Sequence, residues 1–132
     1  MRAAAAIVAV ALVGCGLAIG EPAWVADRPR LASCGEVTLH DDEVMPADMR
    51  RCMLAALNAG QGAEQIVHHR DPTDGLPVDQ WVRLLPDGSV ELIQHLDPER
   101  NAEGSWELLR CGEVEVVDGM MTFVDCQMVE TR

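Results

Sequence analysis

Five cysteines constrain the fold of this chain more than any other residue type. Cys15 ends an apolar N-terminal stretch, whereas Cys34, Cys52, Cys111 and Cys126 are spread through the rest of the 132 residues. An even number of cysteines after such a stretch is typical of an exported domain, and four cysteines can pair in three ways. We therefore expect two disulfides among these four, each stabilising the fold by about 2–4 kcal/mol.

The spacing of these cysteines argues against redox or zinc chemistry. No two of them stand in the C-x-x-C arrangement of thiol oxidoreductases and zinc knuckles. The sequence also contains no HExxH helix, no phosphate-binding glycine loop and no Gly-x-Ser-x-Gly elbow around a nucleophilic serine. We expect no cofactor and assign no catalytic residue.

Residues 1–14 have the pattern of a bacterial signal peptide. Arg2 supplies a positive charge, and residues 3–13 form an uncharged, mostly apolar run that is too short to cross a bilayer. The run leads into Leu12-Val13-Gly14-Cys15, which resembles the lipobox of bacterial lipoproteins. In that family the cysteine thiol receives a diacylglyceryl group, and two acyl chains give durable anchoring. The resemblance implies lipidation at Cys15 and a location at the extracytoplasmic face of the cell membrane.

Two other interpretations of the N-terminus remain open. A conventional signal peptidase could cut after Gly20, because Ala18-Ile19-Gly20 places small residues where that enzyme needs them. The apolar run could also stay uncleaved as a weakly hydrophobic anchor. All three interpretations export the domain.

The charge of the chain excludes nucleic acid as a partner. The sequence has 22 acidic residues against 10 arginines and no lysine, for a net charge of -12. Such a polyanion is repelled by phosphate backbones. Aromatic side chains amount to three Trp and one Phe, too few for a base-stacking platform.

Periodicity divides the exported chain into a lipidated N-terminus and tether over 15–33 and a single domain over 34–132. Apolar residues at helical spacing predict a helix over 46–59, with Pro46 at its start and Gly60 at its end. Pro86-Asp87-Gly88-Ser89 and Asp118-Gly119 are typical hairpin turns. Strands are predicted over 36–40, 64–69, 81–85, 90–96, 106–111, 113–117 and 121–127.

This order of elements predicts an α+β fold in which one helix packs on an antiparallel sheet of about five strands, braced by two disulfides. Cys52 falls on the apolar face of the predicted helix and should point at the sheet. We therefore expect it to bond the strand residue Cys111, which leaves Cys34 to bond Cys126. Trp81 and Trp106 should pack in the core against the helix.

A set of short turn and strand motifs runs through the domain: Gly62-Ala63-Glu64, Thr73-Asp74-Gly75-Leu76-Pro77, Asp87-Gly88-Ser89-Val90-Glu91, Trp106 and Cys111. In these residues the chain resembles certain small uncharacterised secreted domains of Gram-positive bacteria. The resemblance covers roughly residues 34–112 and implies a similar fold, with no activity attached. Where such domains usually have a Glu-Gly-Asp-Pro turn, this chain has Asp74-Gly75-Leu76-Pro77.

The histidines give only a weak indication of a metal site. His40 with Asp41, Asp42 and Glu43 offers ligands to a hard cation, although a solvated acidic loop explains the same residues. His68 and His69 are adjacent on a predicted strand, so their side chains should point to opposite faces. The leading hypothesis is a non-enzymatic, membrane-anchored module that binds an envelope protein partner. The alternatives are an envelope enzyme that uses surface carboxylates and a weak binder of divalent cations.

Overall fold

The computed structural model describes residues 22–96 and 105–131. The signal segment 1–14, the lipobox with Cys15 and the alternative cleavage site at Gly20 lie outside the described residues. Two helices and six strands form within the described ranges. In chain order they are α1 (Ala23–Ala26), β1 (Ala32–Thr38), α2 (Ala47–Ala59), β2 (Ala63–Arg70), β3 (Pro77–Leu84), β4 (Val90–Leu96), β5 (Ser105–Val117) and β6 (Met120–Thr131).

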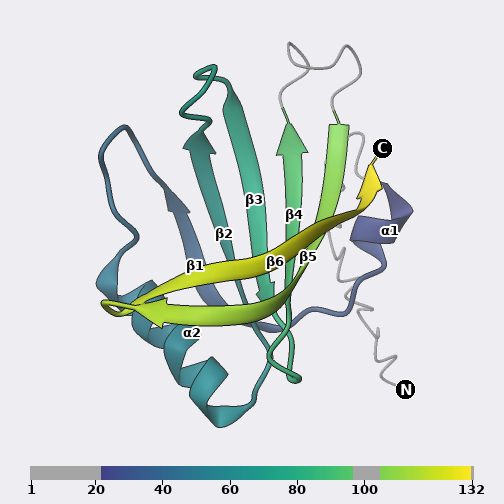
Figure 1. Ribbon diagram of the computed structural model, residues 1–132. Coiled ribbons are helices and arrows are strands. Elements are labelled where there is room, and N and C mark those ends of the chain that lie inside the picture. Colours follow the sequence, from purple (N-terminus) through teal and green to yellow (C-terminus); the bar gives the residue numbers. More distant parts are fainter. Residues whose placement is uncertain (1–21, 97–104, 132) are drawn as a thin grey trace, which may run out of the picture.

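The six strands form one sheet in the order β1-β2-β3-β4-β5-β6, with α2 against one of its faces (Figure 1). Neighbours from β2 to β6 pair antiparallel, but β1 pairs parallel with β2. The expectation of about five antiparallel strands was therefore right in outline and wrong in detail. A parallel pair needs a crossover connection, and α2 supplies it between β1 and β2.

The predicted local signals explain most of these elements. Helix α2 begins after Pro46 and ends at Gly60, whose φ of 63° closes the helix in the left-handed conformation. Asp118 and Gly119 both have positive φ, as the tight turn between β5 and β6 requires. The backbone N–H of Leu85 donates a hydrogen bond of 2.9 Å to the carbonyl of Ser89 across the predicted turn between β3 and β4.

The β5–β6 hairpin gives the sheet its curvature. The predicted strands 106–111 and 113–117 are one continuous strand, β5, and its second half swings with β6 across the sheet toward α2 (Figure 1). Val114, Met121 and Phe123 from this part of the hairpin pack against the buried core. We call the face of the sheet under α2 and the hairpin the helix face.

The main core lies on the helix face. Alternate residues of β2, β3, β4 and β5 point toward α2, where Met53 is completely buried. This burial of apolar side chains is the main source of stability in a domain of this size. The buried members of the core are Met53, Ala63, Val82, Leu84, Val90, Leu92 and Cys111.

The opposite face is covered by residues 22–31, which we call the N-terminal strap. Val25 of α1 packs with Ile93, Trp106 and Leu108, and Trp81 lies beside them. The predicted tether over 15–33 is therefore wrong for its second half, because α1 and the start of β1 belong to the folded domain. The two tryptophans are packed in a core as predicted, but against α1 rather than the helix 46–59.

The disulfides join Cys34 to Cys52 and Cys111 to Cys126. The predicted pairs, Cys52 with Cys111 and Cys34 with Cys126, are wrong. Helix α2 crosses over between adjacent strands, which brings Cys52 next to β1, with its Cα 5.5 Å from that of Cys34. Cys111 and Cys126 are directly opposite each other in the β5–β6 register, so each is the nearest cysteine to the other.

Candidate functional site

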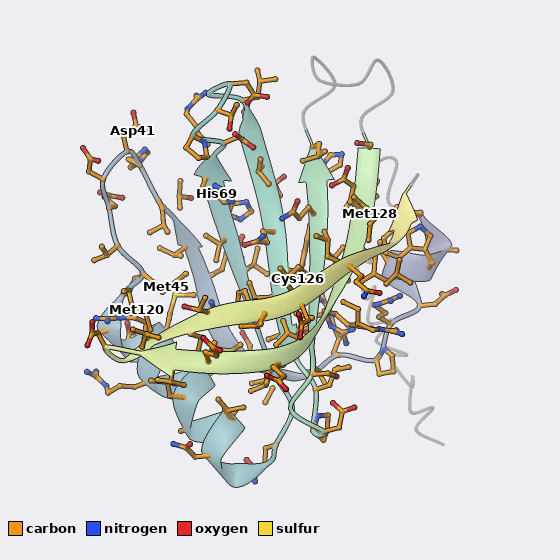
Figure 2. All side chains as sticks on the ribbon, in the orientation of Figure 1. Asp41, Met45, His69, Met120, Cys126 and Met128 are labelled. Atoms are coloured by element: carbon orange, nitrogen blue, oxygen red, sulfur yellow. A yellow bond between two sulfur atoms is a disulfide. The ribbon has the colours of Figure 1, made fainter. Side chains whose placement is uncertain are left out.

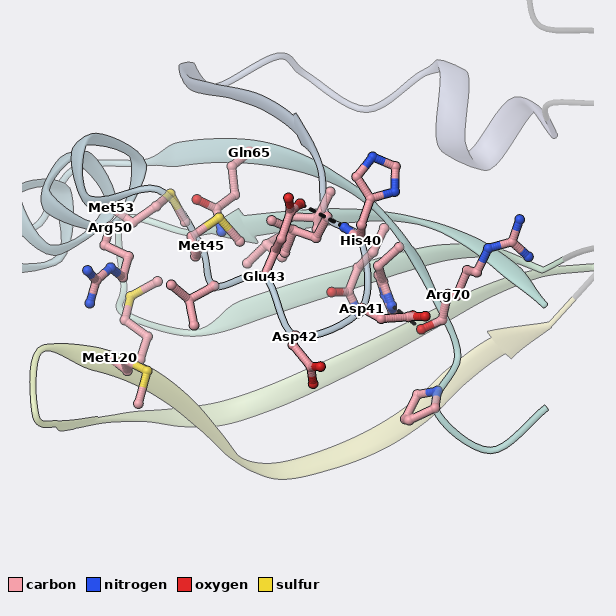
Figure 3. Close-up of a pocket in the computed structure, with 18 of the residues that line it drawn as sticks. His40, Asp41, Asp42, Glu43, Met45, Arg50, Met53, Gln65, Arg70 and Met120 are labelled. Atoms are coloured by element: carbon pink, nitrogen blue, oxygen red, sulfur yellow. Dashed lines mark hydrogen bonds between the residues drawn. The ribbon is translucent and has the colours of Figure 1, made fainter. Parts of the chain in front are cut away.

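A cavity of about 870 Å³ opens on the helix face, and we call it the hairpin cavity. Its walls come from the loop after β1, from α2, from β2 and β3, and from the tip of the β5–β6 hairpin (Figures 2 and 3). Its volume lies within the 300–1,000 Å³ that is usual for small-molecule sites. The hairpin forms one wall of this cavity because β5 bends out of the plane of the sheet.

Most of the inner lining is apolar and rich in methionine. Val67 and Val82 form part of the sheet wall, Met53 comes from α2, and Met121 and Phe123 come from the hairpin. Met45 and Met120 approach from the loop and the hairpin tip (Figure 2). Methionine is unbranched and flexible, so such a wall adapts to ligands of irregular shape.

Two polar atoms in the lining are buried without a hydrogen-bond partner among the described residues. One is Oε1 of Gln65, whose residue is only 6 % exposed, and the other is Nε of Arg50. Figure 3 shows Gln65 rising from β2 beside the part of the cavity that holds Met45 and Met53. Buried polar groups in native proteins are nearly always paired, so each of these two atoms is a candidate contact for a ligand in the cavity.

The acidic loop predicted as a weak cation site lies at the rim of this cavity. His40, Asp41, Asp42 and Glu43 all contribute to the lining and are exposed to solvent. Glu43 Oε2 accepts a hydrogen bond of 2.9 Å from the backbone N–H of His40, which tightens the loop. Across the two described ranges, no group of three or more His, Cys, Asp or Glu side chains is arranged to hold a metal ion.

The two adjacent histidines separate as the strand pattern predicted. His69 faces the hairpin cavity, whereas His68 lies on the opposite face. His68 Nδ1 is 2.6 Å from an Asp79 oxygen, and its Nε2 is 2.6 Å from a Glu36 oxygen. Hydrogen bonds to the carboxylates of Asp79 and Glu36 raise the pKa of His68 above its usual value. The His68 side chain therefore ties β1 to β3 across β2.

A ladder of charges runs across the strap face, buried at Glu64, Arg83 and Glu91 and exposed at its Arg110 end. Glu64, Arg83, Glu91 and Arg110 are register partners on four successive strands, so acid and base alternate. Burial by itself raises the pKa of Glu91, but hydrogen bonds from Arg28 and Arg110 outweigh it and hold that pKa below the usual value.

The strap caps this ladder. Arg28 Nε lies 3.1 Å from Glu91 Oε2, and Arg30 Nη1 lies 3.4 Å from Glu64 Oε1. Arg83 also donates to the backbone carbonyl of Pro29. These contacts explain why the strap is folded. The charged groups of the strap and the ladder pair with one another, which gives the ladder a structural role.

The hairpin cavity was not predicted from the sequence. Its residues come from five separate segments, and their individual patterns are those of ordinary core positions. The one available signal was Gln65, a polar residue at a position where the strand alternation of β2 points inward.

Comparisons with known proteins add no assignment. No protein-family model, no curated protein and no solved structure matches this chain. Within the described residues, no helix is long and apolar enough to cross a membrane. The chemistry of the hairpin cavity is therefore inferred from the geometry of its lining residues.

Proposed function

We propose that this chain is a membrane-anchored binding protein that holds a small apolar molecule in the hairpin cavity. The observation that carries the proposal is a cavity of about 870 Å³ with an apolar wall and a buried Gln65, whose Oε1 has no hydrogen-bond partner in the described part of the chain. A site of this kind combines hydrophobic contact with one or two placed polar groups, which is the usual composition of small-molecule sites. Anchoring through a lipidated Cys15 is part of the same proposal.

The folded strap supports a location of the domain close to the membrane. Only residues 16–21 separate Cys15 from Pro22, where the described domain begins. Six residues span at most about 20 Å when fully extended. A protein anchored at Cys15 thus keeps the folded domain near the lipid surface, from which an apolar ligand can be drawn.

Uptake of a hydrophobic dye tests the binding proposal. The purified full chain should raise the fluorescence of N-phenyl-1-naphthylamine in a saturable way. Leu54 of α2 lines the cavity, so Leu54→Trp should fill it and weaken dye binding at least tenfold. Ala55→Trp, on the exposed side of the same helix, should bind like the wild type. Equal saturation in the two tryptophan variants, both folded by circular dichroism, would place the dye elsewhere.

Metabolic labelling with a fatty acid tests the anchor. Wild-type cells should incorporate the label into this protein, and Cys15→Ser should lose it. Secretion of an unlabelled wild-type protein would favour cleavage after Gly20.

A protein partner is the second candidate function, and it is favoured by exposed apolar residues on the hairpin. β6 lies at one edge of the sheet. Val116, Val117, Met120, Met128 and Val129 are each about half exposed on β5 and β6. Exposed apolar residues on an edge strand are a typical surface for pairing with another chain. Crosslinking in intact envelopes should capture the same partner repeatedly with wild type and lose it with Val129→Lys.

The other two alternatives depend on the acidic loop. Asp41, Asp42 and Glu43 could act on a substrate in the cavity or bind divalent cations. Calorimetry with millimolar calcium or magnesium tests the cation alternative. Chemical turnover of a bound ligand, lost in Glu43→Gln, would favour an enzyme.

A further inference from the structure

The buried amide of Gln65 selects among ligands for the hairpin cavity. The residue is more than nine-tenths buried, lines the cavity, and leaves Oε1 without a partner among the described residues. An amide oxygen accepts hydrogen bonds and cannot donate them. A ligand that satisfies it must therefore bring an O–H or N–H group into an apolar site.

Arg50 adds the complementary requirement. Its Nε is buried in the same lining and also has no partner among the described residues. A guanidinium nitrogen only donates, so it needs an acceptor from the ligand. A ligand hydroxyl group can donate to Gln65, and its oxygen or another oxygen of the same head group can accept from Arg50.

The charges around the cavity decide against an anionic ligand. Four carboxylates oppose two guanidinium groups in the lining, and the whole chain carries a net charge of -12. A carboxylate ligand is repelled by this rim and has no proton for Gln65. A neutral head group with an O–H avoids both the repulsion by the rim and the lack of a donor for Gln65. The charged lining residues are Asp41, Asp42, Glu43, Asp71, Arg50 and Arg70.

We propose that the hairpin cavity binds a neutral single-chain amphiphile with a hydroxyl head group, the class of monoacylglycerols and long-chain alcohols. The head group donates to Gln65 Oε1, and the hydrocarbon chain packs against Met53, Val82 and Phe123. This assignment rests on the proposed binding function and names its ligand class. A membrane within reach of the anchor supplies molecules of this class.

Competition against the bound dye tests the assignment on the purified full chain. Three probes share a ten-carbon chain: 1-decanoylglycerol, methyl decanoate and decanoate. The glyceride should displace the dye at a concentration at least tenfold below that of the methyl ester, which has no donor for Gln65. The glyceride should also displace the dye at a concentration about tenfold below that of decanoate at pH 7.5. Equal potency of the glyceride and the ester, or a preference for decanoate, would overturn the assignment.

Substitution of Gln65 locates the preference. Gln65→Leu removes the acceptor at similar volume, so the glyceride should weaken about tenfold while the ester binds at least as well as before. Gln65→Met is a second variant in case branching disturbs the sheet. Gln127→Leu on exposed β6 is the control and should leave both affinities unchanged.

The outcomes separate the two proposals. Absence of saturable dye binding to the wild type would reject the binding function itself. Dye binding without a glyceride preference, or a preference that survives in Gln65→Leu and Gln65→Met, would reject only the ligand class.

Discussion

Arg83 and Glu91 face each other across β3 and β4, with 2.6 Å between Nη1 and Oε2, and both side chains are more than nine-tenths buried. Arg83 also reaches Glu64 and the backbone carbonyl of Pro29, so one guanidinium joins the sheet to the strap. A buried ion pair adds little compared with a well-packed apolar pair, but loss of one partner is costly.

Replacement of Arg83 should be strongly destabilising. Arg83→Met leaves the carboxylates of Glu64 and Glu91 buried with fewer partners and should lower the free energy of unfolding by about 3–5 kcal/mol. Urea unfolding followed by tryptophan fluorescence measures this change. Arg51→Met, on the exposed side of α2, is the control and should stay within about 0.5 kcal/mol of the wild type. A loss below about 1 kcal/mol in Arg83→Met would mean that the strap does not depend on the ladder.

Stability should fall as the pH rises through the raised pKa of His68. The hydrogen bonds to Asp79 and Glu36 favour the imidazolium of the folded state. Their contribution is fully present below the unfolded pKa of about 6.5 and disappears as the pH rises above the folded pKa. Urea unfolding between pH 5.5 and 9 should show this decline in the wild type and a smaller one in His68→Gln. Parallel profiles for the two proteins would contradict the tie between β1 and β3.

The two disulfides should contribute separately to stability. Their cysteines are 18 and 15 residues apart in sequence, so each closes a short loop. Paired replacement by serine, Cys34→Ser with Cys52→Ser or Cys111→Ser with Cys126→Ser, should cost about 3 kcal/mol in either case. Thermal unfolding without reductant measures both losses. Peptide mapping of the wild type checks the pairing, and a Cys52–Cys111 peptide would refute it.

Gly35 should resist substitution because its backbone has a φ of 113° in the bulge of β1. A side chain there is strained by this φ, whereas its Cβ would meet Met49 of α2 only at an ordinary contact distance of 3.6 Å. Gly35→Ala should therefore destabilise the protein by about 1–3 kcal/mol. Gly112→Ala is a matched control, because a Cβ at that strand position meets no atom within 4 Å. Equal stability of the two variants in urea would show that the bulge relaxes freely.

The sequence by itself determined the elements whose signals are local. Helix α2 follows from apolar spacing between Pro46 and Gly60, and the β5–β6 turn follows from Asp118-Gly119. Such signals act over a few residues and do not depend on the rest of the chain. The opposite directions of His68 and His69 follow from strand geometry alone.

Tertiary structure alone decided the relationships between distant segments. The parallel placement of β1 chose Cys34 for Cys52, and the bend of β5 toward α2 created the hairpin cavity around Gln65. The strap is folded because Arg28 binds Glu91 of β4 and Arg30 binds Glu64 of β2. Each carboxylate is more than thirty residues away in sequence. Long-range partners of this kind are selected by strand order and curvature, and these are set by the packing of the whole sheet rather than by any local pattern.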